Sequence, residues 1–128
     1  MIIDDVKVTE RGWAGHYFCS HKCNFRRNTL LEYKDKKWVV STVGAMFADK
    51  YAIDKNELGF TTIGLDRYYE TMAFEAKKEG IYYEANVEKH IDFDSDWCID
   101  KCDFETDQEA NDMHENVVKE LIKKIKIL

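Results

Sequence analysis

The sequence predicts an α+β fold, in which a mostly antiparallel sheet of about five strands carries a C-terminal helix packed on one face. Three observations support this prediction. Short β-branched and aromatic runs recur along most of the chain, one amphipathic helical pattern closes it, and its 128 residues suit a single domain, 1–128.

The N-terminal residues predict two short strands. Residues 2–9 alternate weakly between apolar and polar side chains, as an edge strand does, and residues 15–19 form a second short candidate. Residues 20–27 are polar and end in paired arginines, so we expect a connection there.

The clearest pattern is a hairpin. Residues 29–33 and 37–43 are rich in β-branched and aromatic side chains, and residues 34–36 between them are polar. We expect Gly44 to end the second strand and residues 45–51 to form a short helix.

Residues 68–76 fit either a helical face or a strand face. We favour a strand, because residues 77–80 resemble a hairpin turn before the aromatic run 81–87. The alternation of that run continues to residue 94, which predicts another strand.

Residues 107–127 predict the helix. Thr106 and Glu109 have the spacing of a capping box, acidic side chains fill the first turn, and lysines fill the last. The apolar stripe is wide enough to pack across the sheet. A helix that pairs with a second copy of the chain, giving a homo-oligomer, is the alternative.

The composition bounds the class of protein. A net charge of −6 argues against direct nucleic-acid binding, which needs cations to replace phosphate counterions. No apolar run approaches the roughly 20 residues that span a bilayer, and the first residues do not resemble a secretory signal. We therefore expect no membrane association and a cytoplasmic protein with reduced cysteines.

The charge is unevenly spread along the chain. Residues 7–40 hold eight Lys or Arg against three acidic residues, whereas residues 91–117 hold ten acidic residues against one lysine. Such a dipole can steer an anionic ligand to the basic end. Two solvated surfaces without a ligand are the alternative.

The four cysteines form two pairs of equal spacing, Cys19 with Cys23 and Cys98 with Cys102. Four thiolates can hold a tetrahedral zinc ion. The spacing is wider than in a zinc knuckle, and the second pair begins 75 residues after the first ends. We expect no cofactor, with zinc as the alternative to four reduced thiols.

The paired arginines are the most ligand-like group, because guanidinium forks bind phosphate or carboxylate and stack on aromatic rings. The alternative is that an arginine pairs with an internal acid and that the tryptophans belong to the core. The predicted ligand-binding residues are Arg26, Arg27, Trp13, His16, Trp38, Arg67 and Tyr68.

A catalytic centre is the weaker hypothesis. His16 and Cys19 lie close enough in sequence for a Cys–His nucleophile. No orienting third group and no oxyanion hole can be identified for them, so we favour a protein that is not an enzyme.

Four segments resemble those of a family of small, uncharacterised phage and prophage proteins. They are Gly12-Trp-Ala-Gly-His-Tyr-Phe-Cys19, Cys23-Asn-Phe-Arg-Arg-Asn-Thr-Leu-Leu31, Val39-Val-Ser-Thr-Val-Gly44 and Arg67-Tyr-Tyr-Glu-Thr-Met-Ala-Phe74. The resemblance implies a phage context, in which small proteins often block or sequester a host component. It implies no site residue.

Together these features predict a small binding protein that captures an anionic, nucleotide-like ligand to counter a host defence. The first alternative is an inhibitor that masks a host protein with an acidic, nucleic-acid-mimicking surface. The second is a small enzyme with a Cys/His centre.

Overall fold

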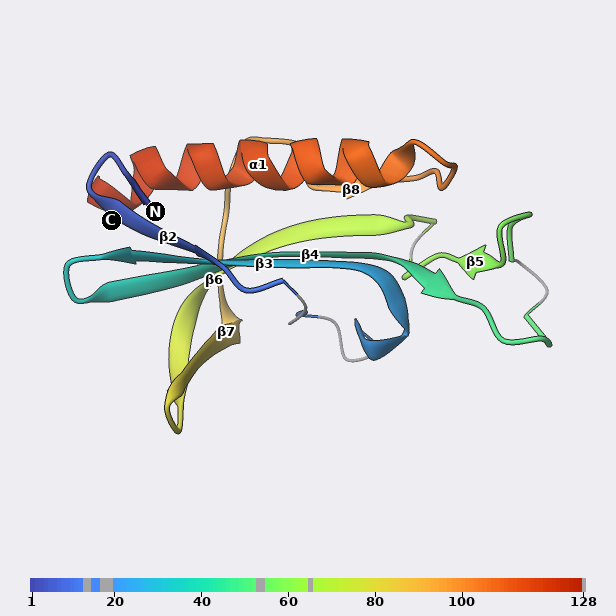
Figure 1. Cartoon of the computed structure of the whole chain (residues 1–128), viewed down its shortest axis with the longest axis horizontal. Helices are drawn as coiled ribbons and strands as arrows, with labels where there is room; N and C mark the ends of the chain where they lie inside the picture. Colours follow the sequence, from blue (N-terminus) through green and yellow to red (C-terminus); the bar gives the residue numbers. More distant parts are fainter. Residues whose placement is uncertain (13–14, 17–19, 53–54, 65, 128) are drawn as a thin grey trace.

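The computed structural model describes residues 1–12, 15–16, 20–52, 55–64 and 66–127 (Figure 1). These residues form eight strands, one α-helix and two short 3-10 turns. The elements are β1 (Ile2–Ile3), β2 (Val6–Glu10), η1 (Ser20–Lys22), β3 (Cys23–Tyr33), β4 (Lys36–Phe47), β5 (Phe60–Thr61), β6 (Tyr69–Glu79), β7 (Tyr82–Ile91), β8 (Cys98–Ile99), α1 (Thr106–Lys124) and η2 (Ile125–Ile127).

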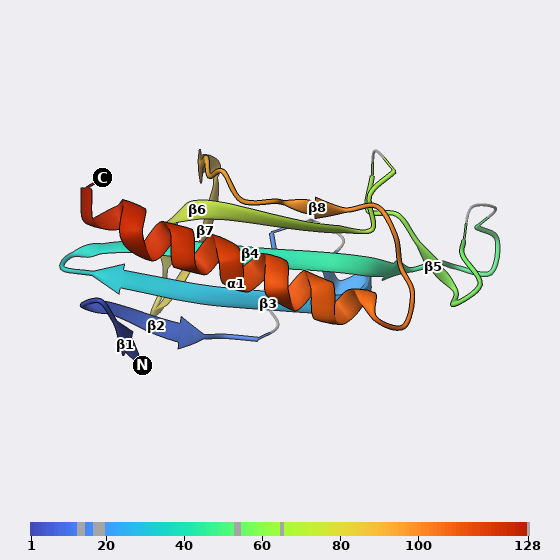
Figure 2. The same ribbon diagram turned by 90° about the horizontal axis from the view of Figure 1, so that it is seen from above.

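All strand pairs are antiparallel, in the order β1-β2-β3-β4-β6-β7, with β5 beside the end of β4 and β8 beside the start of β6. The β6–β7 hairpin curls out of the plane, so the sheet resembles half a barrel (Figure 1). The helix α1 crosses the other face of the sheet (Figure 2). The predicted α+β class is confirmed. The strand number is not, because three strands of only two residues add to five longer ones.

The core lies mainly between α1 and the sheet. Side chains alternate along β4, so that Trp38 and Val40 face the helix while Val39 and Val43 face the other side. All of residues 38–45 are buried, because both faces of this central strand are covered. The buried residues of the main core are Val6, Leu31, Trp38, Val40, Ala73, Val117, Val118, Leu121, Ile122 and Ile125.

The predicted hairpin is confirmed but is longer than expected. β3 begins at Cys23, so most of the predicted polar connection 20–27 is strand, and β4 runs on to Phe47 through the predicted end at Gly44. The short helix predicted over 45–51 is wrong for the same reason. Gly44 is needed for close approach: a Cβ there would lie 2.3 Å from the ring of Tyr69, which pairs with it across the strands.

The other predicted strands agree in part. The strand preferred for 68–76 is confirmed as β6, and the strand predicted to reach residue 94 ends as β7 at Ile91. The edge strand over 2–9 is interrupted by a tight turn at Asp4 and Asp5, both with positive φ. Most of the candidate strand 15–19 lies outside the described residues.

The helix is confirmed, but its predicted capping box is wrong. Residue Glu105 occupies the N-cap position without a side-chain cap, and Thr106 is the first helical residue. The Thr106 hydroxyl instead exchanges hydrogen bonds with Asp103 in the preceding turn. The helix buries its apolar side against the sheet, and no helix in the described part of the chain is long and apolar enough to cross a membrane.

We predict that Gly44→Ala lowers the free energy of unfolding by about 1–3 kcal/mol, because the added methyl group would overlap the Tyr69 ring. Urea denaturation measures this loss. The control is Ser41→Ala on the same strand, which removes a buried hydroxyl that has no hydrogen-bond partner among the described residues. That change should be nearly neutral or stabilising, and an equal loss in both variants would contradict the role assigned to Gly44.

Candidate functional site

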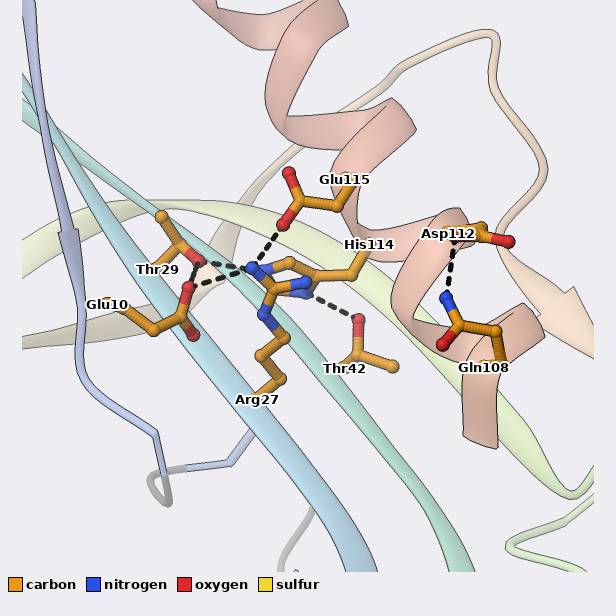
Figure 3. A network of polar contacts seen from close by, with 8 residues as sticks. All are labelled: Glu10, Arg27, Thr29, Thr42, Gln108, Asp112, His114 and Glu115. Atoms are coloured by element: carbon orange, nitrogen blue, oxygen red, sulfur yellow. Dashed lines mark hydrogen bonds and ion pairs between the residues drawn. The ribbon is translucent and has the colours of Figure 1, made fainter. Parts of the chain in front are cut away.

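One buried histidine joins the helix to the sheet (Figure 3). His114 on α1 is fully buried, and its Nε2 and Nδ1 each lie 2.7 Å from a threonine hydroxyl, that of Thr29 on β3 and that of Thr42 on β4. The Thr42 hydroxyl lies 2.6 Å from that of Thr71 on β6. His114 therefore links α1 directly to β3 and β4, and through Thr42 to β6.

The directions of these hydrogen bonds follow from one carboxylate. Thr29 donates its hydroxyl proton to Glu10 at 2.9 Å, so its oxygen can only accept from His114. His114 therefore carries its proton on Nε2, and Nδ1 accepts from the Thr42 hydroxyl. Thr42 in turn accepts from Thr71. Every polar atom of the histidine ring is satisfied when the ring is neutral.

The pKa of His114 agrees with that assignment. Burial, reinforced by the positive charge of Arg27, lowers the pKa of His114 from 6.5 to about 3. Arg27 pairs with Glu10 at 3.0 Å and also with Glu115 on the helix. Figure 3 also shows a hydrogen bond between Gln108 and Asp112, nearer the start of α1 and outside this network.

A second polar cluster lies on the opposite face of the sheet. The Glu70 carboxylate, with its side chain 8% exposed, accepts from His16 Nε2 at 3.0 Å and from Arg67 Nε at 2.8 Å. The Arg67 guanidinium also stands over the ring of Trp97, 5.2 Å from its centre. Burial raises the pKa of Glu70, but hydrogen bonds from His16 and Arg67 outweigh burial and hold it below its usual value.

The two predicted arginines do not share a pocket. Arg26 and Arg27 are neighbours in β3, so their side chains point to opposite faces of the sheet. Arg27 faces the helix and its two carboxylates. Arg26 pairs across the strands with Val43, which pairs with Glu70, so Arg26 lies on the face of the second cluster. A site that joins both guanidinium groups is therefore not formed.

The other predicted ligand-binding residues do not form a single site. His16 and Arg67, far apart in sequence, meet at Glu70. Trp38 is a core residue that is 4% exposed, and Tyr68 packs against the cluster that includes Ala45 and Tyr69. Trp13 lies outside the described residues.

The candidate metal and catalytic residues are only partly described. Cys19 lies outside the described residues, so the structure does not describe the four-cysteine site or the His16–Cys19 pair. Cys23 packs with Val43, whereas Cys98 is exposed on β8 and Cys102 lies near Tyr69. Among the residues that the structure describes, no three His, Cys, Asp or Glu side chains are grouped so that they could hold a metal ion.

Residues 92–112 form a strongly acidic surface. Nine of their carboxylates are exposed, and Lys101, paired with Glu109 at 2.9 Å, is the single lysine among them. We call these nine residues the acidic surface: Asp92, Asp94, Asp96, Asp100, Asp103, Glu105, Asp107, Glu109 and Asp112. Trp97, 47% exposed, and Phe104, 91% exposed, lie within the same segment.

Two surface hollows border this segment. The larger, about 740 Å³, is open and lies between residues 94–96 and the C-terminal half of α1. The smaller, about 300 Å³, lies beside Phe104. None of the predicted ligand-binding residues that the structure describes lines either hollow.

Sequence reasoning missed Glu70, His114 and Trp97 as members of polar clusters. A charged residue within a mostly apolar strand, as Glu70 is, was a usable signal for a buried ion pair. The role of His114 depends on strands that are distant in sequence, and no local pattern reports it.

No family model matches this chain, and neither a curated protein nor a solved structure is significantly similar to it.

We predict that the protein loses stability as the pH falls from 6.5 to 5. The unfolded chain binds a proton at His114 near pH 6.5, whereas the folded chain does so only near pH 3, so acid favours unfolding. This one group should lower the free energy of unfolding with a slope that rises toward about 1.4 kcal/mol per pH unit as the pH approaches 5. Urea denaturation at several pH values measures the slope.

The matched control is His90→Gln, which alters an exposed histidine and should keep the slope. His114→Gln should reduce it, because the titrating group is removed. A free energy of unfolding that stays constant between pH 7 and pH 5 in the unmodified protein would contradict a buried neutral His114.

Proposed function

We propose that the protein is a non-enzymatic binding protein that masks a basic partner protein with its acidic surface. The observation that carries the proposal is the exposure of nine carboxylates over residues 92–112, with Lys101 as the single opposing lysine. At neutral pH this region carries a charge of about −8. Such a surface attracts proteins whose own ligand is a polyanion.

The nature of the surface supports a macromolecular partner rather than a small molecule. Small ligands are bound in concave pockets that bury most of their area. The acidic surface extends over residues 92–112, from the segment after β7 into the first turns of α1, and contains the exposed rings of Trp97 and Phe104. Aromatic side chains are enriched at protein interfaces.

The identity of the partner is proposed from the resemblance of residues 12–74 to phage proteins. In that context the partner is a host protein that binds nucleic acid, and masking it counters a host defence in the host cytoplasm. The carboxylates would take the place of backbone phosphates.

We predict that the protein displaces protamine from a labelled DNA duplex, because its carboxylates compete with the phosphates for the same arginines. The triple variant Asp94→Asn, Asp96→Asn and Asp100→Asn should raise the concentration needed for displacement by about tenfold, since each lost contact weakens salt-dependent binding. Fluorescence anisotropy of the duplex measures displacement.

The control variant carries the same charge change on other elements: Asp4→Asn, Asp35→Asn and Glu88→Gln, all at exposed positions. It should displace protamine nearly as well as the unmodified protein. Equal losses in the two triple variants would mean that only net charge matters, and the proposal would be withdrawn.

A second candidate function is capture of an anionic, nucleotide-like small molecule on the face opposite the helix. One observation favours it: His16 and Arg67 converge at Glu70, and the Arg67 guanidinium lies against the partly exposed Trp97 ring. An oriented guanidinium beside an aromatic ring suits a phosphate and a base. Arg26 adds a further positive charge on this face.

If this second function holds, a nucleoside phosphate should raise the melting temperature, because a ligand at 100 times its Kd stabilises the native state by about 2.7 kcal/mol. Arg26→Gln should reduce that increase, whereas Lys55→Gln, at an exposed position in another loop, should not. Thermal shift assays with mono-, di- and triphosphates provide the measurement. No increase with any of them would eliminate the candidate.

A further inference from the structure

A phenylalanine side chain just before the helix is exposed to solvent. Phe104 is 91% exposed, although burying a side chain of this size is worth roughly 1.5–3 kcal/mol. The backbone amides of the residues on both sides of it form hydrogen bonds within the turn. Asp103 N donates to the Thr106 hydroxyl at 2.9 Å, and Glu105 N donates to the Asp103 carboxylate at 3.0 Å. The ring is therefore presented by an ordered turn.

The hollow of about 300 Å³ lies beside this ring. It is lined by Asn56, Glu57, Leu58, Cys102, Asp103 and Phe104. Asn56 connects the two chain segments that line the hollow. Its Nδ2 donates to the Cys102 carbonyl at 3.2 Å, and its Oδ1 accepts from the amides of Leu58 and Phe60. Hydrogen bonds therefore hold the two segments that line the hollow next to each other.

The lining combines apolar and negative groups. Leu58 and Phe104 provide apolar surface, while Glu57 and Asp103 provide carboxylates, and no lysine or arginine is among the described residues that line the hollow. Neither carboxylate forms an ion pair with another described residue. The Asp103 oxygen Oδ1 accepts hydrogen bonds from within the turn, which leaves acceptor capacity on the carboxylate.

We propose that this hollow receives an arginine side chain of the basic partner protein, with its guanidinium stacked on Phe104 and paired with Asp103 or Glu57. This inference rests on the proposed function and adds a specific anchor to it. The apolar stem of the arginine covers Leu58, as long cationic side chains commonly do on apolar surface.

Arginine fits this site better than lysine for physical reasons. Its planar guanidinium is weakly hydrated, stacks on aromatic faces and pairs bidentately with carboxylates. The lysine ammonium is compact and strongly hydrated, so it gains less from Phe104 and Leu58. The hollow therefore discriminates between two side chains of equal charge, whereas the rest of the acidic surface does not.

The test uses two fluorescein-labelled octapeptides of equal charge, one built with arginine and one with lysine at four alternate positions separated by glycine. Anisotropy titrations of the full-length protein give the Kd of each. We expect the arginine peptide to bind about fivefold more tightly, in line with the strength of a stacked cation at a solvent-accessible ring. Phe104→Ala should remove that preference.

Three further variants separate the arginine preference from the general attraction of positive charge. Ile81→Ala removes an apolar side chain that is also exposed, 83%, at the β6–β7 turn, and should leave the preference unchanged. Leu58→Ala should reduce the preference without changing charge. The triple variant Asp94→Asn, Asp96→Asn and Asp100→Asn should weaken both peptides alike and keep the preference.

The outcomes separate this inference from the proposed function. If the two peptides bind equally well and lose affinity in the triple variant, the acidic surface binds cations but the arginine site is refuted. If Phe104→Ala keeps the full preference, the site is also refuted. If neither peptide binds at low salt, the proposed function itself fails, and the inference fails with it.

Discussion

The structure depends on a neutral histidine buried between a helix and three strands. His114 accepts a hydrogen bond from Thr42 and donates one to Thr29, so hydrogen bonds set the distance between α1 and the sheet at the middle of the helix. Apolar packing alone is non-directional and would tolerate a shift of the helix along its axis. The ring prevents such a shift, because either nitrogen left without a partner would carry the cost of a buried, unsatisfied polar atom.

The two neighbouring arginines of β3 have different roles on the two faces of the sheet. Glu10 accepts from Thr29 and pairs with Arg27, and Arg27 reaches Glu115 on the helix. This arginine is therefore engaged in joining β2, β3 and α1. Its neighbour Arg26 lies on the opposite face because of the pleat of β3. One dipeptide thus supplies a structural cation to one face and a surface cation to the other.

The features that could be predicted from the sequence are those encoded by local periodicity. The β3–β4 hairpin and α1 follow from alternation or helical spacing within a single segment. The residues of β6 fit both periods, and the turn-like residues that follow them favour the strand. The two-residue strands β1, β5 and β8 are too short to show a period, and they form only because a longer strand lies beside them.

The candidate site was harder to predict, since it is assembled from distant residues. The sequence predicts a strand end at Gly44, but Gly44 is an interior position where a tyrosine ring lies against the backbone. The sequence predicts that His16 and Arg67 bind a ligand, yet no local pattern indicates that Glu70 lies between them. Adjacent arginines in a polar stretch suggested one pocket, and only the extension of β3 to Cys23 places them on opposite faces.

The acidic surface is attached to the fold through its backbone, and this explains why its charges remain available. Glu120 on α1 accepts from the amides of Asp94 and Ser95, while the carbonyls of Trp97 and Ile99 accept from amides at the start of β6. These contacts fix the path of the segment through its backbone, and Lys101, paired with Glu109, is the single lysine within it. A segment required only for stability would gain more from ion pairs or from shorter acidic runs, because closely spaced like charges repel. In the proposed function, these exposed carboxylates contact the positive charge of a basic partner protein.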